Sequence, residues 1–254
     1  MRQLITLIRH EIRLLFISPP VYFAAVTFML LMGFIYWAIL RSLSIEPQDA
    51  SATVQFFSLF WLPVFFLVPL LTMRSLAAER NNATLEALFS TPVPRIFIVL
   101  SKFLSAYFLY LALWGLTLFF PFIGESVLSD NLSSQSLLDF AELTGGLTFI
   151  AISGLLFVSI GIFTSSLTRS QLVAAMLAFT LLFIFCVGAQ QLEYASYNYL
   201  SSDSFFYDSI QYVNVFRHLE DFSHGIIDTR PFIFYLSATW LFLSLTLSNI
   251  ESKS

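Results

Sequence analysis

Six apolar runs without a charged side chain constrain this sequence more than any other feature. They are about 16 to 25 residues long and cover residues 21–40, 56–73, 103–123, 143–168, 171–188 and 232–247. A helix of about 20 residues crosses roughly 30 Å of hydrocarbon and satisfies its backbone hydrogen bonds internally. The runs therefore predict an all-α integral membrane protein with six transmembrane helices. Pro63 and Pro69 predict a kink in the second of them.

The composition supports the same class of protein. Hydrophobic residues make up 57% of the chain and charged residues 11%, and the mean hydropathy is +0.81. Soluble domains carry about 25% charged residues, because their surfaces face water. The first run is longer than the core of a cleaved secretory signal. We therefore expect an uncleaved anchor and a single transmembrane domain over residues 1–254.

Positively charged residues indicate the orientation of the six helices. Short cytoplasmic loops of membrane proteins retain Lys and Arg. If the N-terminus is cytoplasmic, the inner segments hold nine of the twelve basic residues, namely Arg2, Arg9, Arg13, Arg74, Arg80, Arg95, Lys102, Arg169 and Lys253. The outer segments then hold Arg41, Arg217 and Arg230. We predict that both termini are cytoplasmic. Most acidic residues fall outside, so the net charge of −4 gives no indication of a nucleic-acid partner.

Residues 1–18 have the pattern of an amphipathic helix at the inner membrane interface. Basic residues gather on one side of the helix and apolar residues cover the other. Glu11 is the exception, because it falls on the apolar side. Two interpretations are open: Glu11 pairs with a basic residue of the inner segment 74–102, or it reaches water along the surface. Ser18, Pro19 and Pro20 end this helix.

The inner segment 74–102 contains a short predicted helix with an apolar patch. Leu85, Leu88 and Phe89 have the spacing i, i+3, i+4 and so share one helical face. Such a patch packs against the protein's own helices or enters a groove of another protein, and periodicity alone leaves both possibilities open.

Two further stretches predict packing features. Gly154 and Gly161 are seven residues apart and share a face of the fourth span, which allows another helix to approach closely. The outer segment 189–231 is long and rich in Tyr and Phe, which predicts short helices on the outer leaflet. His218 and His224 fall in this segment, and we expect them to be solvated.

The motifs of several functional classes are missing. The sequence lacks a G-x-x-x-x-G-K-[ST] phosphate loop and an H-E-x-x-H metal motif, and its six runs contain no Asp, Glu, Lys, Arg or His. Intramembrane proteases and proton-coupled carriers need such groups within their spans. We therefore expect no enzymatic activity, no cofactor and no metal. The single cysteine, Cys186, excludes an intrachain disulfide.

Three sequence motifs resemble the permease subunits of type-2 ABC exporters, particularly the bacterial permeases of the gliding-motility and nitrous-oxide-reductase-maturation type. Residues 11–22 read E-I-R-L-L-F-I-S-P-P-V-Y and are similar to the family's entry into the first span. Residues 79–93 read E-R-N-N-A-T-L-E-A-L-F-S-T-P-V and resemble its inner-loop motif, the most specific of the three. Residues 215–228 read V-F-R-H-L-E-D-F-S-H-G-I-I-D and resemble its segment before the last span.

The resemblance implies a role for the inner segment. In such permeases this segment is a coupling helix that docks on a separate cytoplasmic ABC ATPase subunit. The residues at the matching positions are Glu79, Arg80, Thr84, Leu85, Glu86, Leu88 and Phe89. The apolar ones would be anchors, the turn at Arg169 a second contact, and Glu11 a brace for the N-terminal helix. Ala83 replaces the usual Gly and predicts that the coupling helix begins a turn earlier, because Ala favours helix.

The resemblance also implies an assembly. Two permeases, identical or not, would work with two ATPases in a bacterial inner membrane, surrounded by lipid, and export a cargo between them. The residues that could line the cleft are Phe57, Phe60, Phe65, Phe179 and Phe183, although Phe residues that face lipid are an equally good interpretation. The alternative function is a membrane scaffold or assembly protein that binds a cytoplasmic partner through the inner loop and transports nothing.

Overall fold

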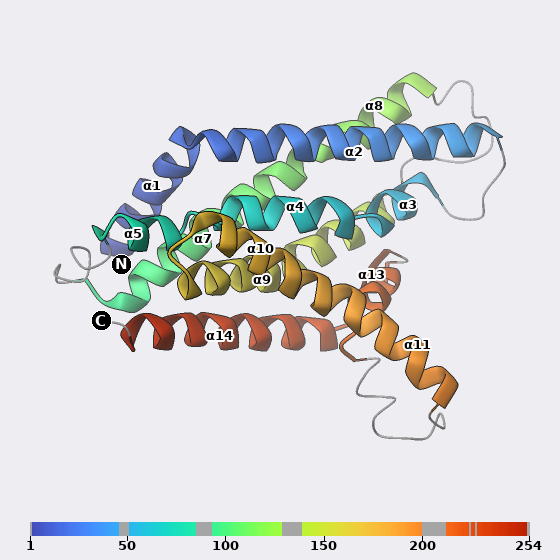
Figure 1. Cartoon of the computed structure of the whole chain (residues 1–254). Coiled ribbons are helices and arrows are strands. Elements are labelled where there is room, and N and C mark those ends of the chain that lie inside the picture. The colour runs from blue at the N-terminus through green and yellow to red at the C-terminus, as the bar shows by residue number, and fades with distance from the viewer. Residues whose placement is uncertain are drawn as a thin grey trace.

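A computed structural model describes residues 2–45, 51–84, 93–128, 139–199, 212–223, 225–226 and 228–252. All regular elements in these residues are helices, and the long ones lie roughly along one axis (Figure 1). Six helical stretches are long and apolar enough to cross a membrane, namely Pro19–Leu43, Trp61–Asn81, Arg95–Ser126, Phe140–Leu167, Gln171–Ala195 and Arg230–Glu251. The prediction of six transmembrane helices is confirmed, with most ends shifted by only a few residues.

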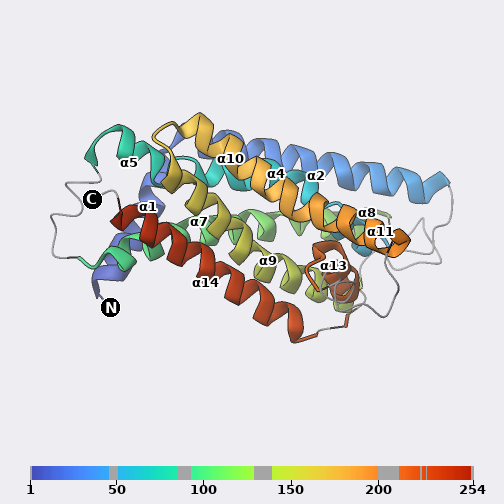
Figure 2. The ribbon, with the colours of Figure 1, turned by 60° about the horizontal axis from the view of Figure 1, so that its bottom comes forward.

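The first half of the chain contains α1 (Arg2–Ile17), α2 (Pro19–Ile45), α3 (Ala52–Ser58), α4 (Trp61–Thr72), α5 (Ala77–Asn81), α7 (Arg95–Thr117) and α8 (Phe119–Leu128). The second half contains α9 (Phe140–Leu167), α10 (Gln171–Phe183), the π-helix η1 (Ile184–Gly188), α11 (Ala189–Tyr199), α13 (Val215–Ser223) and α14 (Arg230–Glu251). Both termini lie at the end of the bundle that carries α5 (Figures 1 and 2).

Two spans are interrupted one turn before a proline. Pro63 has no N–H for the carbonyl of Leu59, which accepts instead from the N–H of Leu62 at 3.3 Å, and α3 and α4 separate there. Pro121 likewise follows the break at Leu118 between α7 and α8. The kink predicted for the second span is therefore a break between two helices, and the break in the third was not predicted.

The fourth span is the centre of the bundle. In the apolar stretch of α9, 72% is buried within the protein, compared with 22% in the apolar stretch of α14. Helices α4, α7, α10, α13 and α14 all contact α9. Aromatic side chains fill the space around it, for example Phe60, whose ring centroid is 5.1 Å from that of Phe149. Four of the other five spans thus pack directly on one buried helix, and the first span, α2, packs on α4 and α7 instead.

Two glycines of α9 allow other helices to approach closely, as their spacing predicts, but a different helix approaches at each glycine. A Cβ atom at Gly154 would lie 2.3 Å from the ring of Tyr110 on α7. A Cβ atom at Gly161 would lie 2.3 Å from the hydroxyl oxygen of Thr72 on α4. The shared face therefore lies between α7 and α4 and does not serve a single partner.

The fifth span continues beyond the bundle. Helices α10, η1 and α11 follow one another without a gap, and α11 diverges from the other helices (Figure 1). The π-turn over Ile184–Gly188 has no counterpart in the prediction. That α11 and α13 lie at an outer leaflet, and α1 at an inner one, stays a prediction.

Helix α13 is attached to the last span through His218, a residue that the sequence predicts to be solvated. Only 6% of its surface is exposed, and its Nδ1 lies 3.2 Å from the hydroxyl of Tyr235. Its ring also contacts that of Phe234 at 6.1 Å between centroids. The expectation is wrong for His218, because α13 turns this face toward α14. His224 lies outside the described residues.

This burial predicts a pH-dependent stability. Burial lowers the pKa of His218, and Arg217 lowers it further, whereas the carboxylates of Asp221 and Asp228 oppose the shift. In the unfolded chain the pKa of a histidine is about 6.5. Below that pH the unfolded state binds more protons than the folded state, so folding stability falls as the pH falls.

We therefore expect the melting temperature of the purified protein to decrease between pH 7.5 and 5.5. In the His218→Gln variant, which has a neutral hydrogen-bonding side chain at every pH, that decrease should be smaller. Thermal unfolding followed by tryptophan fluorescence measures both proteins. Identical pH profiles would contradict this account.

Candidate functional site

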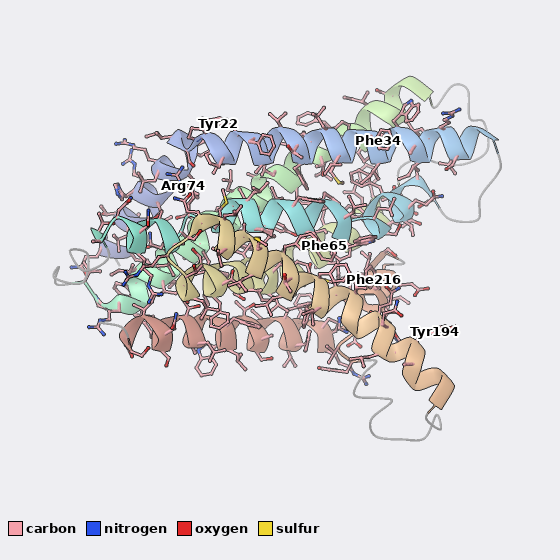
Figure 3. All side chains as sticks on the ribbon, viewed as in Figure 1. Tyr22, Phe34, Phe65, Arg74, Tyr194 and Phe216 are labelled. Carbon is pink, nitrogen blue, oxygen red and sulfur yellow. The ribbon has the colours of Figure 1, made fainter. Side chains whose placement is uncertain are left out.

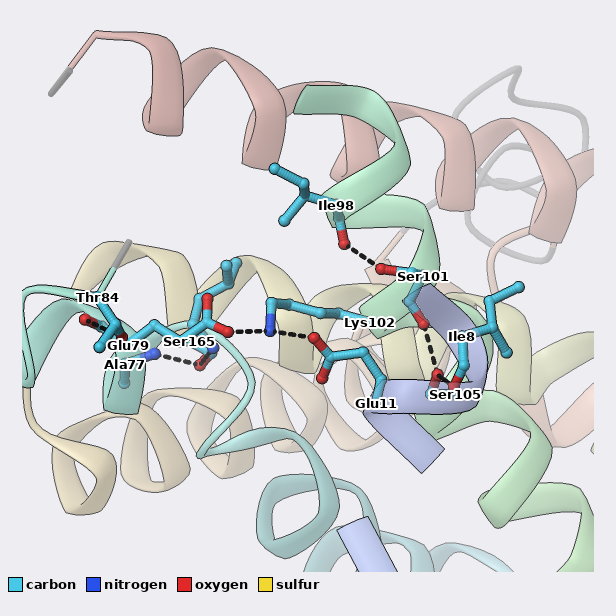
Figure 4. Close-up of polar contacts among 11 residues, drawn as sticks. Ile8, Glu11, Ala77, Glu79, Thr84, Ile98, Ser101, Lys102, Ser105 and Ser165 are labelled. Carbon is cyan, nitrogen blue, oxygen red and sulfur yellow. Dashed lines mark hydrogen bonds and ion pairs between the residues drawn. The ribbon is translucent and has the colours of Figure 1, made fainter. Parts of the chain in front are cut away.

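A buried ion-pair cluster joins three helices at the end of the bundle that carries the termini. The Nζ of Lys102 lies 2.7 Å from Oε1 of Glu11 and 2.5 Å from Oε1 of Glu79 (Figure 4). The lysine side chain is 2% exposed, and the two glutamates are 15% and 23% exposed. One ammonium group therefore holds carboxylates from α1 and α5 on the first turns of α7. We call these three residues the lysine cluster.

The packing of α1 on α7 explains why Glu11 lies on the apolar side of its helix. That side faces α7, and the hydroxyl of Ser105 donates to the carbonyl of Ile8 at 3.3 Å. Lys102 lies one turn before Ser105 and so faces Glu11. Of the two interpretations of Glu11, the structure shows the ion pair with a basic residue of segment 74–102. Its role as a brace stays a prediction.

Helix α5 begins on a serine supplied by α9. The backbone N–H groups of Leu76 and Ala77 both donate to Oγ of Ser165 at 3.0 Å. The same hydroxyl donates to the carbonyl of Met73 at 3.2 Å. The first N–H groups of a helix need such an acceptor, and Leu76 at the N-cap position has no side chain that can provide it. The turn between α4 and α5 is thereby attached to the most buried span.

The neighbouring serine of α9 connects α5 to a further helix, α14. Arg80 donates from Nη1 to the carbonyl oxygen of Ser166. Asn249 of α14 donates to the same carbonyl at 2.8 Å and to the serine hydroxyl at 2.9 Å. Arg169 is exposed in the turn between α9 and α10, and both of these helices contact α5. The turn predicted as a second ATPase contact therefore lies near α5.

The end of α5 differs from the expectation based on Ala83. This residue has φ 55°, in the left-handed region, and follows the C-cap Asn82. The segment therefore turns at Asn82 and Ala83, and helical structure resumes at Thr84, which explains why glycine suits position 83. Thr84 follows, and its hydroxyl donates to the carbonyl of Glu79 at 3.3 Å. The predicted residues Leu85, Glu86, Leu88 and Phe89 lie outside the described residues.

The five phenylalanines proposed for a cleft fall into two groups. Phe57 and Phe60 are at most 1% exposed and pack within the chain's own core, so they offer no surface to a cargo here. Phe65 is also buried, but its ring lies 5.9 Å from the rings of Phe179 and Phe183, which are exposed on α10. Of the five, Phe179 and Phe183 could form part of a wall between subunits, with Phe65 packed behind them.

A comparison with known protein families identifies the chain. A family model described as ABC-2 family transporter protein matches residues 22–249. The chain belongs to this family. It is therefore a multi-pass membrane permease of the ABC-2 type, and such permeases associate with an ABC ATPase. No curated protein matches the sequence.

Sequence reasoning missed the residues that hold the site of this permease together. Lys102 was counted only as a basic residue at the inner end of the third span. Ser165 and Ser166 read as ordinary small residues of the fourth span. The sequence does contain features that point to this pair. Glu11 lies on the apolar side of its helix, where a carboxylate requires a positively charged partner, and Lys102 is the last basic residue before an apolar run.

Proposed function

We propose that this permease is one membrane subunit of an ATP-driven exporter and that a separate ATPase docks on the segment between α5 and α7. The family assignment supports a permease. The observation that carries the coupling is the attachment of α5 to α1 and α7 through the lysine cluster and to α9 through Ser165. A movement of the docked ATPase would displace α5, and the helices attached to α5 would move with it, because packed helices move as rigid bodies.

The attachments also divide the predicted contact residues into two roles. Glu79 and Arg80 already have partners inside the chain, namely Lys102 and the carbonyl of Ser166. We propose that they position the segment. Leu85, Leu88 and Phe89 would be the apolar anchors in the ATPase, with Glu86, Thr84 and Arg169 at the edge of the contact.

The proposed orientation places both termini and the docking segment in the cytoplasm of a bacterium, with the chain in its inner membrane. Nine of twelve basic residues fall on that side. The position of both termini at the α5 end of the bundle (Figures 1 and 2) supports the same orientation. Two permeases and two ATPases would then form the working exporter. The exposed Phe179 and Phe183 suit an amphiphilic cargo.

An affinity pull-down tests this function. The tagged permease is purified from membranes in mild detergent with cross-linking, and its partners are identified by mass spectrometry. The expected result is a stoichiometric partner with a Walker A motif, and in proteoliposomes a cargo flux that depends on ATP. A clean preparation without an ATPase would favour the scaffold function instead.

The Leu88→Asp variant should lose this partner. A charge placed in an apolar groove loses its hydration, so we expect the affinity to fall roughly tenfold or more. Asn82→Asp is the matched control, because it adds the same charge to the same segment at an exposed position. The Leu88→Asp protein should still insert and elute as a folded species. If it aggregates while Asn82→Asp does not, Leu88 packs within the permease and the docking assignment is wrong.

A further inference from the structure

A cavity beside the lysine cluster has the size and the lining of a ligand site. Its volume is about 380 Å³, within the range of small-molecule pockets. It lies between α1, the turn from α1 to α2, the connection from α4 to α5, and the first turns of α7. All of these lie at one end of the bundle, near the candidate-span ends Pro19 and Arg95, so this end would face the lipid headgroups.

One wall of the cavity is apolar and continues onto an exposed surface. Leu14, Leu15 and Ile17 of α1 line it. Leu14 is 46% and Ile17 69% exposed, and Phe16 and Tyr22 next to them are more than half exposed. A chain of hydrocarbon leaving the cavity along this surface would cover it.

The lining also holds an arginine whose charge has no carboxylate partner among the described residues. Arg74 donates from Nη1 to the hydroxyl of Ser18 at 2.7 Å and forms no ion pair there. It lies between α1 and the end of α4 (Figure 3). Ser75 adds a second hydroxyl-bearing side chain to the lining. Arginine and hydroxyl groups together are typical donors to a phosphate group.

Charged groups of both signs line the cavity, because Glu11, Glu79 and Lys102 line it together with Arg74. Glu11 and Glu79 share the ammonium group of Lys102, and Oε2 of Glu79 is buried without a hydrogen-bond partner among the described residues. The cavity therefore offers an arginine to a phosphate group and a carboxylate oxygen to a donor. A ligand with a phosphate and an amine on one short headgroup complements both and keeps the charges balanced, whereas a net anionic headgroup adds an uncompensated negative charge.

We propose that this cavity binds a membrane phospholipid with a phosphoethanolamine headgroup. The phosphate accepts hydrogen bonds from Arg74 and Ser18, the ammonium group donates toward the carboxylates of the lysine cluster, and an acyl chain lies along Leu14 and Ile17. A choline headgroup is larger and has no N–H donor, so it fits this arrangement less well. The inference requires only the membrane location of the chain, so its failure leaves the proposed function untouched.

Native mass spectrometry of the detergent-purified protein tests the site with lipids of identical acyl chains. Phosphatidylethanolamine should be retained more strongly than phosphatidylcholine or phosphatidylglycerol and should raise the melting temperature most. Arg74→Gln should weaken its retention roughly tenfold, because a charge-assisted hydrogen bond is lost. Arg13→Gln, which removes an exposed arginine of α1 outside the cavity, should leave retention unchanged.

Three results would overturn the proposal. Equal retention of phosphatidylethanolamine by the wild type and Arg74→Gln would show that the lipid binds elsewhere. Preference for phosphatidylglycerol would contradict the charge argument, and this comparison needs only the wild-type protein if the variant fails to fold. Stabilisation by soluble O-phosphoethanolamine equal to that by the lipid would show that the ligand is a free phosphate ester.

Discussion

Lys102→Met should lower the melting temperature of the permease more than any other single substitution in the lysine cluster. It removes the ammonium group that both Glu11 and Glu79 contact and leaves two largely buried carboxylates without that partner. Removing one member of a buried ion pair costs about 3–5 kcal/mol, because the remaining charge has neither water nor a partner. For a chain of this size that corresponds to a decrease of roughly 6 to 20 °C.

The matched control removes all three charges together. A variant with Lys102→Met, Glu11→Gln and Glu79→Gln should recover most of the lost stability, since no uncompensated charge remains. Thermal unfolding in detergent, followed by size-exclusion chromatography of the heated samples, measures both variants. If the triple variant is as unstable as Lys102→Met, the lysine contributes through its packing and not through its charge.

The same pair of variants separates folding from coupling. The triple variant has a stable fold but no ionic connection between α5, α7 and α1. If the cluster transmits movement, this variant should bind the ATPase normally and show reduced cargo flux for each ATP hydrolysed. Normal flux would mean that the contact of α5 with Ser165 is sufficient for transmission.

The six spans could be predicted from the sequence because each helix must by itself be long and apolar enough to cross the hydrocarbon layer of the membrane. Length and the absence of charge identify a span without knowledge of its neighbours. The breaks at Leu59 and Leu118 follow from proline chemistry, and Pro121 carried the same signal as Pro63. The π-turn at Ile184–Gly188 carries no comparable pattern in the sequence.

The candidate site was harder to predict because its contacts join residues far apart in the chain. Glu11 and Lys102 are separated by 91 positions, and the N–H of Leu76 and Ser165 by 89. The sequence marks Glu11 as needing a partner but does not identify that partner. For Phe57 and Phe60 the difficulty is different. A phenylalanine in an apolar run has the same sequence pattern whether it faces a cleft or the protein core.

Gly145→Ala should have the second large effect, because the atom it would contact belongs to a backbone. A Cβ atom at this position of α9 would lie 1.9 Å from the carbonyl oxygen of Phe222, at the end of α13. A flexible side chain could rotate away, but this carbonyl moves only if α13 moves. Helix α13 would then lose its close packing on α9 together with the burial of His218. Overpacking of this kind costs about 1–3 kcal/mol, and more where backbone must shift.

Gly115→Ala is the matched control for this substitution. Gly115 lies in α7, and a Cβ atom there would meet no atom within 4 Å. Alanine favours helix over glycine by about 1 kcal/mol, so this variant should be as stable as the wild type or slightly more stable. Both variants add one methyl group to a helix, and we would measure their melting temperatures at the same pH. The difference between these temperatures gives the effect of the contact at Gly145. Equal melting temperatures would mean that α13 is not held against α9 at Gly145, and the pH dependence assigned to His218 would then lose its structural basis.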